Sequence, residues 1–474
     1  MLLAVSRSGD ADLIAHASRA LIAADPRVWI ALDVSARRNL WHWNRRTDTA
    51  ARRLATGRPE PLEVLLSACH PDGFVREAAV AAISELDDVV VLPVLALRAA
   101  DWVTEVRDRA RGVCRQYFDR MPTEVVTVLA PVAFALQARQ AGGWLGDALD
   151  GLLRNGPPEA MVAALAAEDR RTRRTAHVIA LDAGRLDVDR MLRTATTDSH
   201  LPIRVMCAEA AIRAARAIGD HDVPRRLLAS GTALVRAEAV RSLGAAGEVD
   251  PATGALADRS ALVRATAQAI VRRAGADPAD RYRALLAARQ PPNPSVIAGL
   301  GEVGTHSDID LLRPWLAHSS SRGRVEAVRA LRRLGNTSPH LLLPLLTDPV
   351  SSVTRQVALS LRRQAGTLDE RSLRLLLDQP HPLHVRTAAC HLLRAHGTWT
   401  RVSVDLHLID DPVPAIRAAA RSDLGNWLAR DAATTYSFPD GARADELTAL
   451  LTDHEAVLGP HQTHLLRFHL GLTR

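Results

Sequence analysis

The sequence predicts an all-α fold, an array of about ten to twelve helix pairs that stack in chain order. Three observations predict it. A short motif recurs about every 31 residues, its apolar positions follow the period of a helix, and a glycine stands near its end. Because a single helix pair cannot bury its own apolar side, stacked neighbours would share one continuous core.

Each repeat is expected to contain a helix marked by an apolar residue, an arginine, two variable residues and an alanine. The last four motif arginines, each 31 residues from the next, are Arg324, Arg355, Arg386 and Arg417. Earlier copies are Arg76, Arg107, Arg204, Arg236 and Arg264. Second apolar segments lie between the marked helices, so each repeat is predicted to be two short helices and a turn. Less regular copies are expected near Arg139, near Arg174 and over 293–304.

The spacing within one copy is that of a helix with a glycine at its end. Apolar residues follow Arg236 at +3, +4 and +7, which places them on one side of a helix. Gly247 follows at +11, where a residue in the left-handed conformation ends many helices.

An acidic residue precedes the motif arginine by six positions in several copies, in the turn before the helix. These turn acids are Asp101, Asp198, Asp258 and Asp411. Such a carboxylate can accept hydrogen bonds from the free amides at the helix start, and it can pair with the arginine of its own or the next repeat. We therefore expect the motif arginine to be structural.

The turn acid, the apolar–arginine pair and the terminal glycine together resemble HEAT repeats, including the bacterial phycobilin-lyase-type HEAT-like repeats. The resemblance covers roughly residues 60–430. It implies a right-handed α-solenoid whose arginine-bearing helices line the concave side and bind macromolecules, often without catalysis. We accordingly expect an irregular N-terminal helical cap over 1–60, the HEAT-like repeat array over 61–430 and a C-terminal helical cap over 431–474.

Composition excludes several classes of protein. The chain has no lysine, which removes lysine Schiff bases and lysine-containing phosphate loops. Its four cysteines are far apart, so neither a disulfide framework nor a zinc finger is expected. The longest apolar stretch, Val89–Leu97, is nine residues long and contains a proline, which is too short to cross a bilayer. We expect a cytoplasmic protein without a membrane partner.

No local motif indicates a catalytic, cofactor or metal site. The run 299–304 matches the pattern GxGxxG, but it falls where neighbouring repeats end a helix, without the surrounding strands of a dinucleotide site. Histidines cluster over 381–396 without the spacing of a metal-binding helix. We expect no cofactor, no metal and no catalytic residue, and we favour a non-enzymatic protein while leaving enzymatic activity open.

Positive charge is concentrated in one stretch of the chain. The net charge is +7, and residues 259–400 contain 20 arginines against 10 acidic residues. A second column of arginines lies eight positions after the motif arginine, at the flank of the predicted core face, and Arg329 at +5 shares that flank. The predicted partner-binding residues are Arg272, Arg329, Arg332, Arg363 and Arg394. Such a stripe suits phosphates or an acidic surface, and the alternative interpretation is a solvated flank neutralised by nearby acids.

These residues lead to two functional hypotheses. The first is a non-enzymatic scaffold that binds a macromolecule, preferably a protein with an acidic surface, on its concave, arginine-rich side. The alternative is a nucleic-acid-binding protein, in particular one similar to the HEAT-like alkylpurine DNA glycosylases, which use aromatic and carboxylate groups in a concave cleft. The residues of that alternative cleft are Asp101, Trp102, Trp144 and Asp147.

Aromatic residues leave further alternatives open. The run 41–46 holds two indoles and two guanidinium groups, which could stack on bases or hold a peptide. Trp102 could instead pack between repeats. A third hypothesis is a lyase-like accessory factor, and the oligomeric state stays open.

Overall fold

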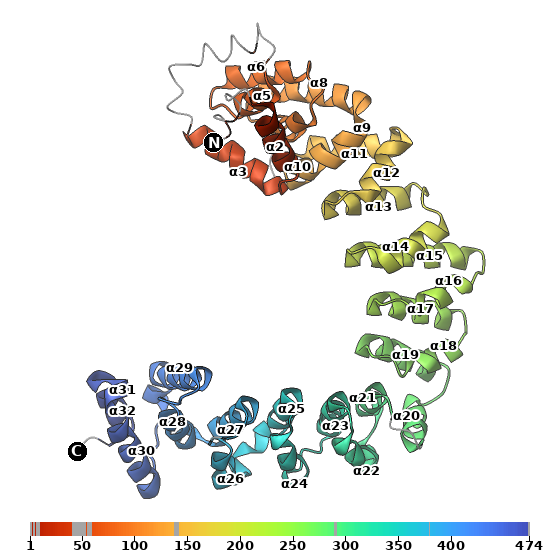
Figure 1. Cartoon of the computed structure of the whole chain (residues 1–474). Coiled ribbons are helices and arrows are strands. Elements are labelled where there is room, and N and C mark those ends of the chain that lie inside the picture. The colour runs from red at the N-terminus through yellow and green to blue at the C-terminus, as the bar shows by residue number, and fades with distance from the viewer. Residues whose placement is uncertain are drawn as a thin grey trace. The chain divides into compact units, whose positions relative to one another are not determined.

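The computed structural model of the chain describes residues 2, 5, 10–39, 54, 59–136, 142–288, 292–378 and 380–472. Over these residues the chain forms helices joined by turns, and none of them lies in a strand (Figure 1). The predicted all-α fold is therefore confirmed. Contacts divide the chain into two compact units, Met1–Ala239 and Val240–Arg474.

The first unit stacks its helices in chain order, with α5 against α6, α6 against α8 and α14 against α15. Its α-helices are α2 (Ala11–Ile22), α3 (Pro26–Asn39), α5 (Pro61–Ala68), α6 (Gly73–Ile83), α7 (Leu92–Arg98), α8 (Thr104–Arg120), α9 (Pro122–Glu124), α10 (Ala130–Ala135), α11 (Gly143–Asn155), α12 (Pro158–Ala166), α13 (Arg170–Asp182), α14 (Val188–Thr197), α15 (Leu201–Ala217) and α16 (Asp222–Leu227). A 3-10 turn, η2 (Val89–Val91), precedes α7, and a π-helical turn, η3 (Val125–Leu129), precedes α10. Helix α17 (Ala233–Ala245) carries the boundary between the units.

The second unit has two rows of helices (Figure 1). Its α-helices are α18 (Asp250–Ala255), α19 (Ala261–Arg273), α20 (Pro278–Ala287), α21 (Pro294–Val303), α22 (Ile309–Leu312), α23 (Ser321–Arg333), α24 (Pro339–Leu342), α25 (Ser351–Leu361), α26 (Glu370–Leu375), α27 (Leu383–His396), α28 (Thr398–His407), α29 (Pro414–Arg430), α30 (Gly441–Asp453), α31 (Glu455–Leu458) and α32 (Pro460–His469). The short 3-10 segments are η4 (His306–Asp308), η5 (Arg313–Ala317), η6 (Leu343–Thr347), η7 (Arg362–Thr367) and η8 (Ala432–Thr434).

In the second unit α23, α25, α27 and α29 lie along one side, and α22, α24, α26 and α28 along the other (Figure 1). Helix α25 packs against both α23 and α27, and α27 packs against α26 and α28. Paired helices stacked in chain order are the architecture that HEAT repeats have, so the resemblance is confirmed at the level of the fold. The cap boundaries at 60 and 431 stay predictions.

In three repeats the helix ends at a glycine, as the sequence predicts. Gly247, Gly275 and Gly335 have φ of +87°, +84° and +82°. This left-handed conformation costs glycine little and other residues more, and it lets the chain leave the helix at once. Side chains at the opposite ends cap the free amides, as where Asp72 accepts a hydrogen bond from the Phe74 amide at 2.9 Å.

In four places an arginine of one repeat forms an ion pair with a carboxylate of the next repeat. Arg76 is fully buried, and its Nε and Nη2 donate to the Asp101 carboxylate, each at 3.0 Å, while Nη1 donates to the His70 carbonyl in its own turn. Four pairs join an arginine to a carboxylate 24 or 25 residues later: Arg76–Asp101, Arg173–Asp198, Arg324–Asp348 and Arg386–Asp411. We call these four arginines the arginine ladder. The structural role expected for Arg76, Arg324 and Arg386 is confirmed, and in the less regular copy expected near Arg174 the paired residue is Arg173.

The glycine run of α21 is a packing feature. A Cβ at Gly299 would lie 2.2 Å from the Tyr282 ring, and one at Gly301 would lie 2.4 Å from the Ala330 Cβ. Both glycines are buried in a helix, so the expectation that this run belongs to a helix is confirmed. Small residues are needed there because α20 and α23 approach the helix closely.

Among the described residues, no helix combines the length and the apolar content needed to cross a membrane. The same residues hold no group of three or more histidine, cysteine or acidic side chains placed to bind a metal ion. The four cysteines are buried free thiols.

Candidate functional site

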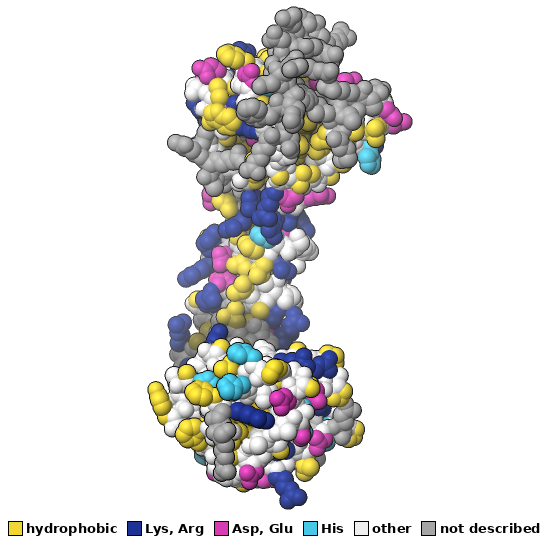
Figure 2. Space-filling view, turned by 90° about the vertical axis from the view of Figure 1, so that its left-hand side faces the viewer, with side chains coloured by type: hydrophobic (Ala, Val, Ile, Leu, Met, Phe, Trp, Pro, Cys, Tyr) yellow, Lys and Arg dark blue, Asp and Glu magenta, His cyan; other side chains and the backbone are white. Residues whose placement is uncertain are grey.

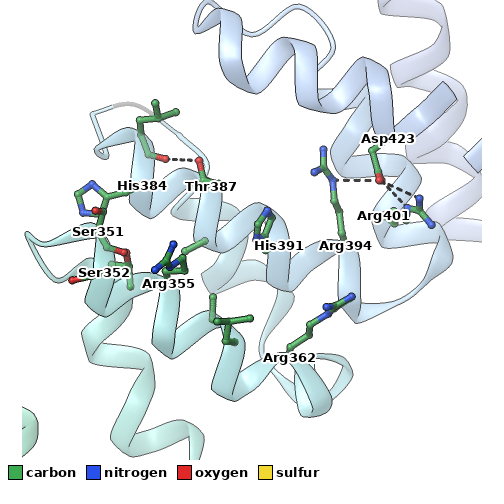
Figure 3. A pocket seen from close by; sticks show the side chains of 16 residues that line it. Ser351, Ser352, Arg355, Arg362, His384, Thr387, His391, Arg394, Arg401 and Asp423 are labelled. Atoms are coloured by element: carbon green, nitrogen blue, oxygen red, sulfur yellow. Dashed lines mark hydrogen bonds and ion pairs between the residues drawn. The ribbon is translucent and has the colours of Figure 1, made fainter. Parts of the chain in front are cut away.

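A groove of about 1070 Å³ lies between α25 and α27 of the second unit (Figure 3). It is lined from α25 and η7 by Ser351, Ser352, Thr354, Arg355, Ala358, Leu359 and Arg362. From α27 it is lined by Leu383, His384, Thr387, Ala388, His391, Arg394 and Ala395, and its far end is formed by Arg401 of α28 and Asp423 of α29.

Helical spacing explains why these side chains face one another. Arg355, Leu359 and Arg362 lie at i, i+4 and i+7, so they share one side of α25 and its continuation into η7. On α27, Thr387, His391 and Arg394 follow the same spacing. The groove is therefore the space between the outward sides of two adjacent helices whose inward sides form the core.

A change in the repeat pattern places Arg355 in this groove. Turn acids elsewhere are followed six positions later by an arginine, but Asp348 is followed at that position by Thr354, which is 1% exposed and donates to the Ser351 carbonyl at 2.9 Å. Arg355 stands one residue further on, rotated by about 100° around the helix, and is exposed. The prediction that Arg355 is a structural motif arginine is therefore wrong.

A histidine joins the repeats at this position instead. His384 Nε2 lies 3.0 Å from the Asp348 carbonyl oxygen, so α27 is held to the turn before α25 without an arginine from α25. The Asp348 carboxylate itself is taken by Arg324 at 2.6 Å. Arg355 is thus left outside the arginine ladder.

Charge is uncompensated on one side of the groove and partly compensated at its far end, where Asp423 lies within ion-pair distance of both Arg394 and Arg401. Among the described residues, no carboxylate lies within ion-pair distance of Arg355 or Arg362, and both are exposed. By contrast, Arg394 lies 2.5 Å from Asp405, and Arg401 lies 2.7 Å from Asp423. Figure 3 shows dashed contacts from Asp423 to Arg394 and Arg401 and one at Thr387, while Arg355 and Arg362 have none among the residues drawn. The surplus charge of the groove therefore belongs to α25 and η7.

Two carboxyl groups at the far end share a proton at neutral pH. Asp405 is 1% exposed, and this burial raises its pKa to about 8, although Arg394 opposes the shift. Burial also works against ionisation of Asp423, but hydrogen bonds from Arg401 and from Asp405 outweigh it and lower its pKa. At pH 7 Asp405 is protonated and Asp423 is ionised.

Apolar side chains and a neutral histidine make the groove amphipathic. Leu359 and Leu383 are each 47% exposed, which is high for leucine in a packed helix array. Burial, followed by the charges of Arg394 and Arg362, lowers the pKa of His391, so its imidazole is neutral at pH 7. The surface offers two cations, two leucines and a few hydroxyl groups.

The predicted partner-binding arginines occupy different environments. Arg272, Arg332 and Arg363 are exposed, and none forms an ion pair with a described carboxylate; they do not line the groove. Arg329 lies 3.0 Å from Glu326. Of the five, Arg394 lines the groove, where it is paired with Asp405. Their role in binding stays a prediction.

Sequence reasoning missed Arg355 and Arg362 as candidate site residues. A signal for Arg355 was present, because the turn acid Asp348 points to Thr354 as the motif position and leaves the next residue free. The same signal covers Arg362, because counting from Thr354 places Arg362, and not Arg363, at the +8 position of the second arginine column. The structure agrees, since Arg362 lines the groove and Arg363 does not.

The residues of the alternative cleft fall into two groups in the first unit. Asp101 is buried, with Arg76 at 3.0 Å and Arg98 at 2.8 Å. Burial alone would raise its pKa, but hydrogen bonds from Arg76 and the Val103 amide, together with the charges of Arg98 and Arg76, lower it. Trp102 is 64% exposed, and the Arg37 guanidinium lies 4.0 Å from its ring centroid. Arg76 also stacks on Trp102, at 4.6 Å.

The second group lies on α11. Trp144 is half-buried, with the Arg111 and Arg115 guanidinium groups 5.0 and 5.3 Å from its ring centroid, and Asp147 is exposed. Asp101 therefore belongs to a buried ion network, and Asp147 stands in solvent. The run 41–46 and Arg139 lie outside the described residues.

Exposed arginine alone does not single out a binding surface. In each unit, the dark blue arginine side chains on the visible face lie among acidic and apolar side chains (Figure 2). What sets the groove apart is the combination of unpaired arginine, exposed leucine and a concave shape.

No family model and no curated protein matches the sequence. Among solved structures, importin beta is similar over 99% of this chain and 66% of its own, with 14% identity and a TM-score of 0.39. Yeast importin-beta (Kap95p) is similar over the same shares, with 12% identity and a TM-score of 0.41. UNC-45 from Drosophila melanogaster is similar over 97% of this chain and 76% of its own, with 12% identity and a TM-score of 0.26. The chain spans just under two thirds of the importin structures. These similarities assign no role to any residue of this chain.

Proposed function

We propose that this chain is a HEAT-like scaffold that binds a partner protein with an acidic surface, and that the groove between α25 and α27 is the main contact. One observation carries the proposal. Arg355 and Arg362 present charge that no described carboxylate neutralises, on the same concave surface as two exposed leucines.

This combination is typical of protein interfaces. Arginine is enriched among the residues that contribute most to binding, especially where apolar neighbours exclude water around it. Arg332 and Arg363 would lie outside the groove as exposed charges that attract an acidic partner during encounter. Such peripheral charges act mainly on the association rate, whereas Arg355 and Arg362 would act on the lifetime of the complex.

Nucleic acid is the competing partner. Its phosphates would also suit Arg355 and Arg362, but the leucines and alanines of the groove make no favourable contact with a sugar–phosphate backbone. The described lining contains no Phe, Tyr or Trp for base stacking, and its rings are the imidazoles of His384 and His391. Asp101 is held in a buried ion network, so its environment does not support a role in base excision. These observations support a protein partner.

Comparative capture from the native host tests the proposal. The baits are the wild-type chain, Arg355→Glu/Arg362→Glu, and the control Arg281→Glu/Arg430→Glu, which makes the same charge change at exposed positions outside the groove. We expect an acidic protein to be recovered in stoichiometric amount by the wild type and the control and to fall at least tenfold with the groove variant.

Equal recovery by all three baits would contradict the proposal. Recovery of nucleic acid in place of protein, with an affinity that falls steeply with salt and falls further in the groove variant, would support the competing partner. Capture of the wild type after nuclease treatment separates the two results.

A further inference from the structure

We propose that the segment of the partner that enters the groove is an acidic amphipathic helix, with two carboxylates about two turns apart and apolar residues between them. This inference rests on the proposed function and adds the kind of partner surface. It follows from the spacing of charge, the position of the apolar side chains and the backbone chemistry of the groove.

The spacing of the two free cations sets the spacing of the acids. Arg355 and Arg362 are seven residues apart on one side of α25 and the start of η7, which is about 10.5 Å along the axis. A partner helix lying along α25 presents side chains at the same interval at positions i and i+7. Each carboxylate could then face one guanidinium group, in a charge-assisted pair.

An exposed leucine lies where the middle of such a helix would pass. Leu359 stands between the two arginines on α25, and Leu383, the first residue of α27, adds apolar surface at the end of the groove where both helices begin. Ala358, Ala388 and Ala395 contribute only methyl groups to its lining, so a partner could approach the backbone closely. Apolar residues at i+3 and i+4 of the partner would cover Leu359, as in other helix-in-groove complexes.

Backbone chemistry favours a helix over an extended segment. Both walls are helices whose amide and carbonyl groups are already paired within the helix, so an extended strand would find few main-chain partners there. The Thr387 hydroxyl is also engaged, because it donates to the Leu383 carbonyl at 2.7 Å. A helix satisfies its own backbone groups and brings only side chains to the groove.

The far end limits the number of acids that the site needs. Asp423 lies 2.7 Å from Arg401 and 3.5 Å from Arg394, so an ionised carboxylate already serves both guanidinium groups. A third carboxylate placed there would be repelled by Asp423 while it was attracted by the arginines. Two acids are therefore expected to contribute most of the electrostatic binding energy.

A designed peptide tests the inference directly. The probe is a helical peptide of about 18 residues with glutamates at i and i+7 and leucines at i+3 and i+4, long enough to hold a helix when stabilised at its ends. Its binding to the full chain is followed by fluorescence anisotropy. We expect saturable binding that weakens at least tenfold in Arg355→Glu/Arg362→Glu and stays unchanged in Arg281→Glu/Arg430→Glu.

A charge-reversed peptide, with lysines in place of both glutamates, provides the reciprocal test. It should fail to bind the wild type and should bind Arg355→Glu/Arg362→Glu. Peptides with the leucines changed to serine, and the chain variant Leu359→Ser, should each weaken binding several-fold. Circular dichroism and the melting temperature check that the chain variants are folded.

Three outcomes would overturn the inference: equal binding to the wild type and the groove variant, no recovery with the reversed peptide, or equal binding after the leucines are removed. Displacement of the bound peptide by a short DNA duplex at lower concentration than by unlabelled peptide would also overturn it. If the acidic partner from capture still depends on Arg355 and Arg362 while the peptide does not bind, the inference fails and the proposed function stands. If neither depends on them, both fail.

Discussion

Thr354 stands at the position that a motif arginine would occupy in its repeat, and that change has two consequences. It removes the guanidinium group that would pair with a carboxylate of the next repeat, and it leaves the following arginine on the solvent side of the helix. His384 restores a contact across the repeats through the Asp348 carbonyl. A binding residue is therefore gained with a modest change in the packing of the array.

In the first unit, some ion pairs between arginine and aspartate are buried, and breaking one would lower the stability of the fold. Asp101 accepts hydrogen bonds from Arg76 and Arg98, and all three side chains are at most 1% exposed. Asp101→Asn would leave the buried Arg76 guanidinium without its carboxylate partner, while Arg98 keeps Asp33 at 2.5 Å, and we expect it to lower the free energy of unfolding by about 3–5 kcal/mol. Asp147→Asn is the matched control, because Asp147 is exposed, and we expect a change below about 0.5 kcal/mol. Urea denaturation followed by circular dichroism measures both.

An equal effect of the two substitutions would contradict this account of Asp101. Loss of a base-excision activity in the folded Asp101→Asn chain would instead favour the glycosylase hypothesis.

Asp405 should make stability depend on pH. Its pKa in the folded chain, about 8, lies far above the ordinary value of 3.8, so the folded state holds a proton that the unfolded state has lost. Stability from this group is complete below about pH 4 and falls as the pH rises toward 8, by at most about 1.4 kcal/mol per pH unit. Asp405→Asn carries no ionisable group and should remove this fall.

The measurement is the free energy of unfolding of both chains at intervals from pH 5 to pH 9. Parallel pH curves for the wild type and Asp405→Asn would show that Asp405 is ionised throughout.

At the scale of single elements, one polar network fixes the last helices of the second unit. Glu370 of α26 lies 2.7 Å from Arg374 and 2.8 Å from Arg443 of α30, and it accepts a hydrogen bond from Thr400 of α28 at 2.9 Å. Burial would raise the pKa of Glu370, but these hydrogen bonds lower it to about 2. Three helices are thus joined through one carboxylate.

The lowered pKa of Glu370 gives a second pH effect, of opposite sign. Stability from this group is present above about pH 4.5 and is lost as the pH falls toward 2. We expect Glu370→Gln to cost on the order of 2 kcal/mol at pH 7, allowing for partial exposure, and little at pH 2. Hydrogen exchange at pH 7 should become faster in α30 and stay unchanged in α19. Unchanged exchange in α30 would show that apolar packing alone holds it.

Several elements could be predicted from sequence because their signals are local. A turn acid, a motif arginine and a glycine define the start, the inter-repeat pair and the end of a helix within a dozen residues. The groove could not be predicted in this way. Its shape depends on which side of α25 faces α27, and a shift of one residue moves Arg355 from the seam between repeats to the surface.

The sequence also could not show which arginines are paired with an acidic residue. Arg394 and Arg362 occupy the same position of the repeat when the count starts at Arg386 and at Thr354, yet one is paired with Asp405 and the other is exposed without an ion pair to a described carboxylate. The partner Asp405 belongs to the next helix, and its distance from Arg394 along the chain follows no repeat rule.

At the scale of the whole molecule, the net charge of +7 is a poor guide to where a partner binds. The surplus lies in residues 259–400, but several arginines in that stretch are engaged within the fold, such as Arg264 with Glu302 at 2.5 Å and Arg283 with Asp308 at 2.7 Å. The charge that is left is concentrated on a few exposed arginines. Arg355 and Arg362 differ from the others because they lie in a groove with exposed leucines.

The central claim, that this groove receives the acidic partner, is tested most directly by a hydrogen-exchange footprint of the full chain with the protein recovered by capture. We predict slower exchange in two segments, residues 351–362 and 383–395, and unchanged exchange in α6 and α11 of the first unit. Protection confined to the first unit, with α25 and α27 exchanging as in the free chain, would contradict the claim.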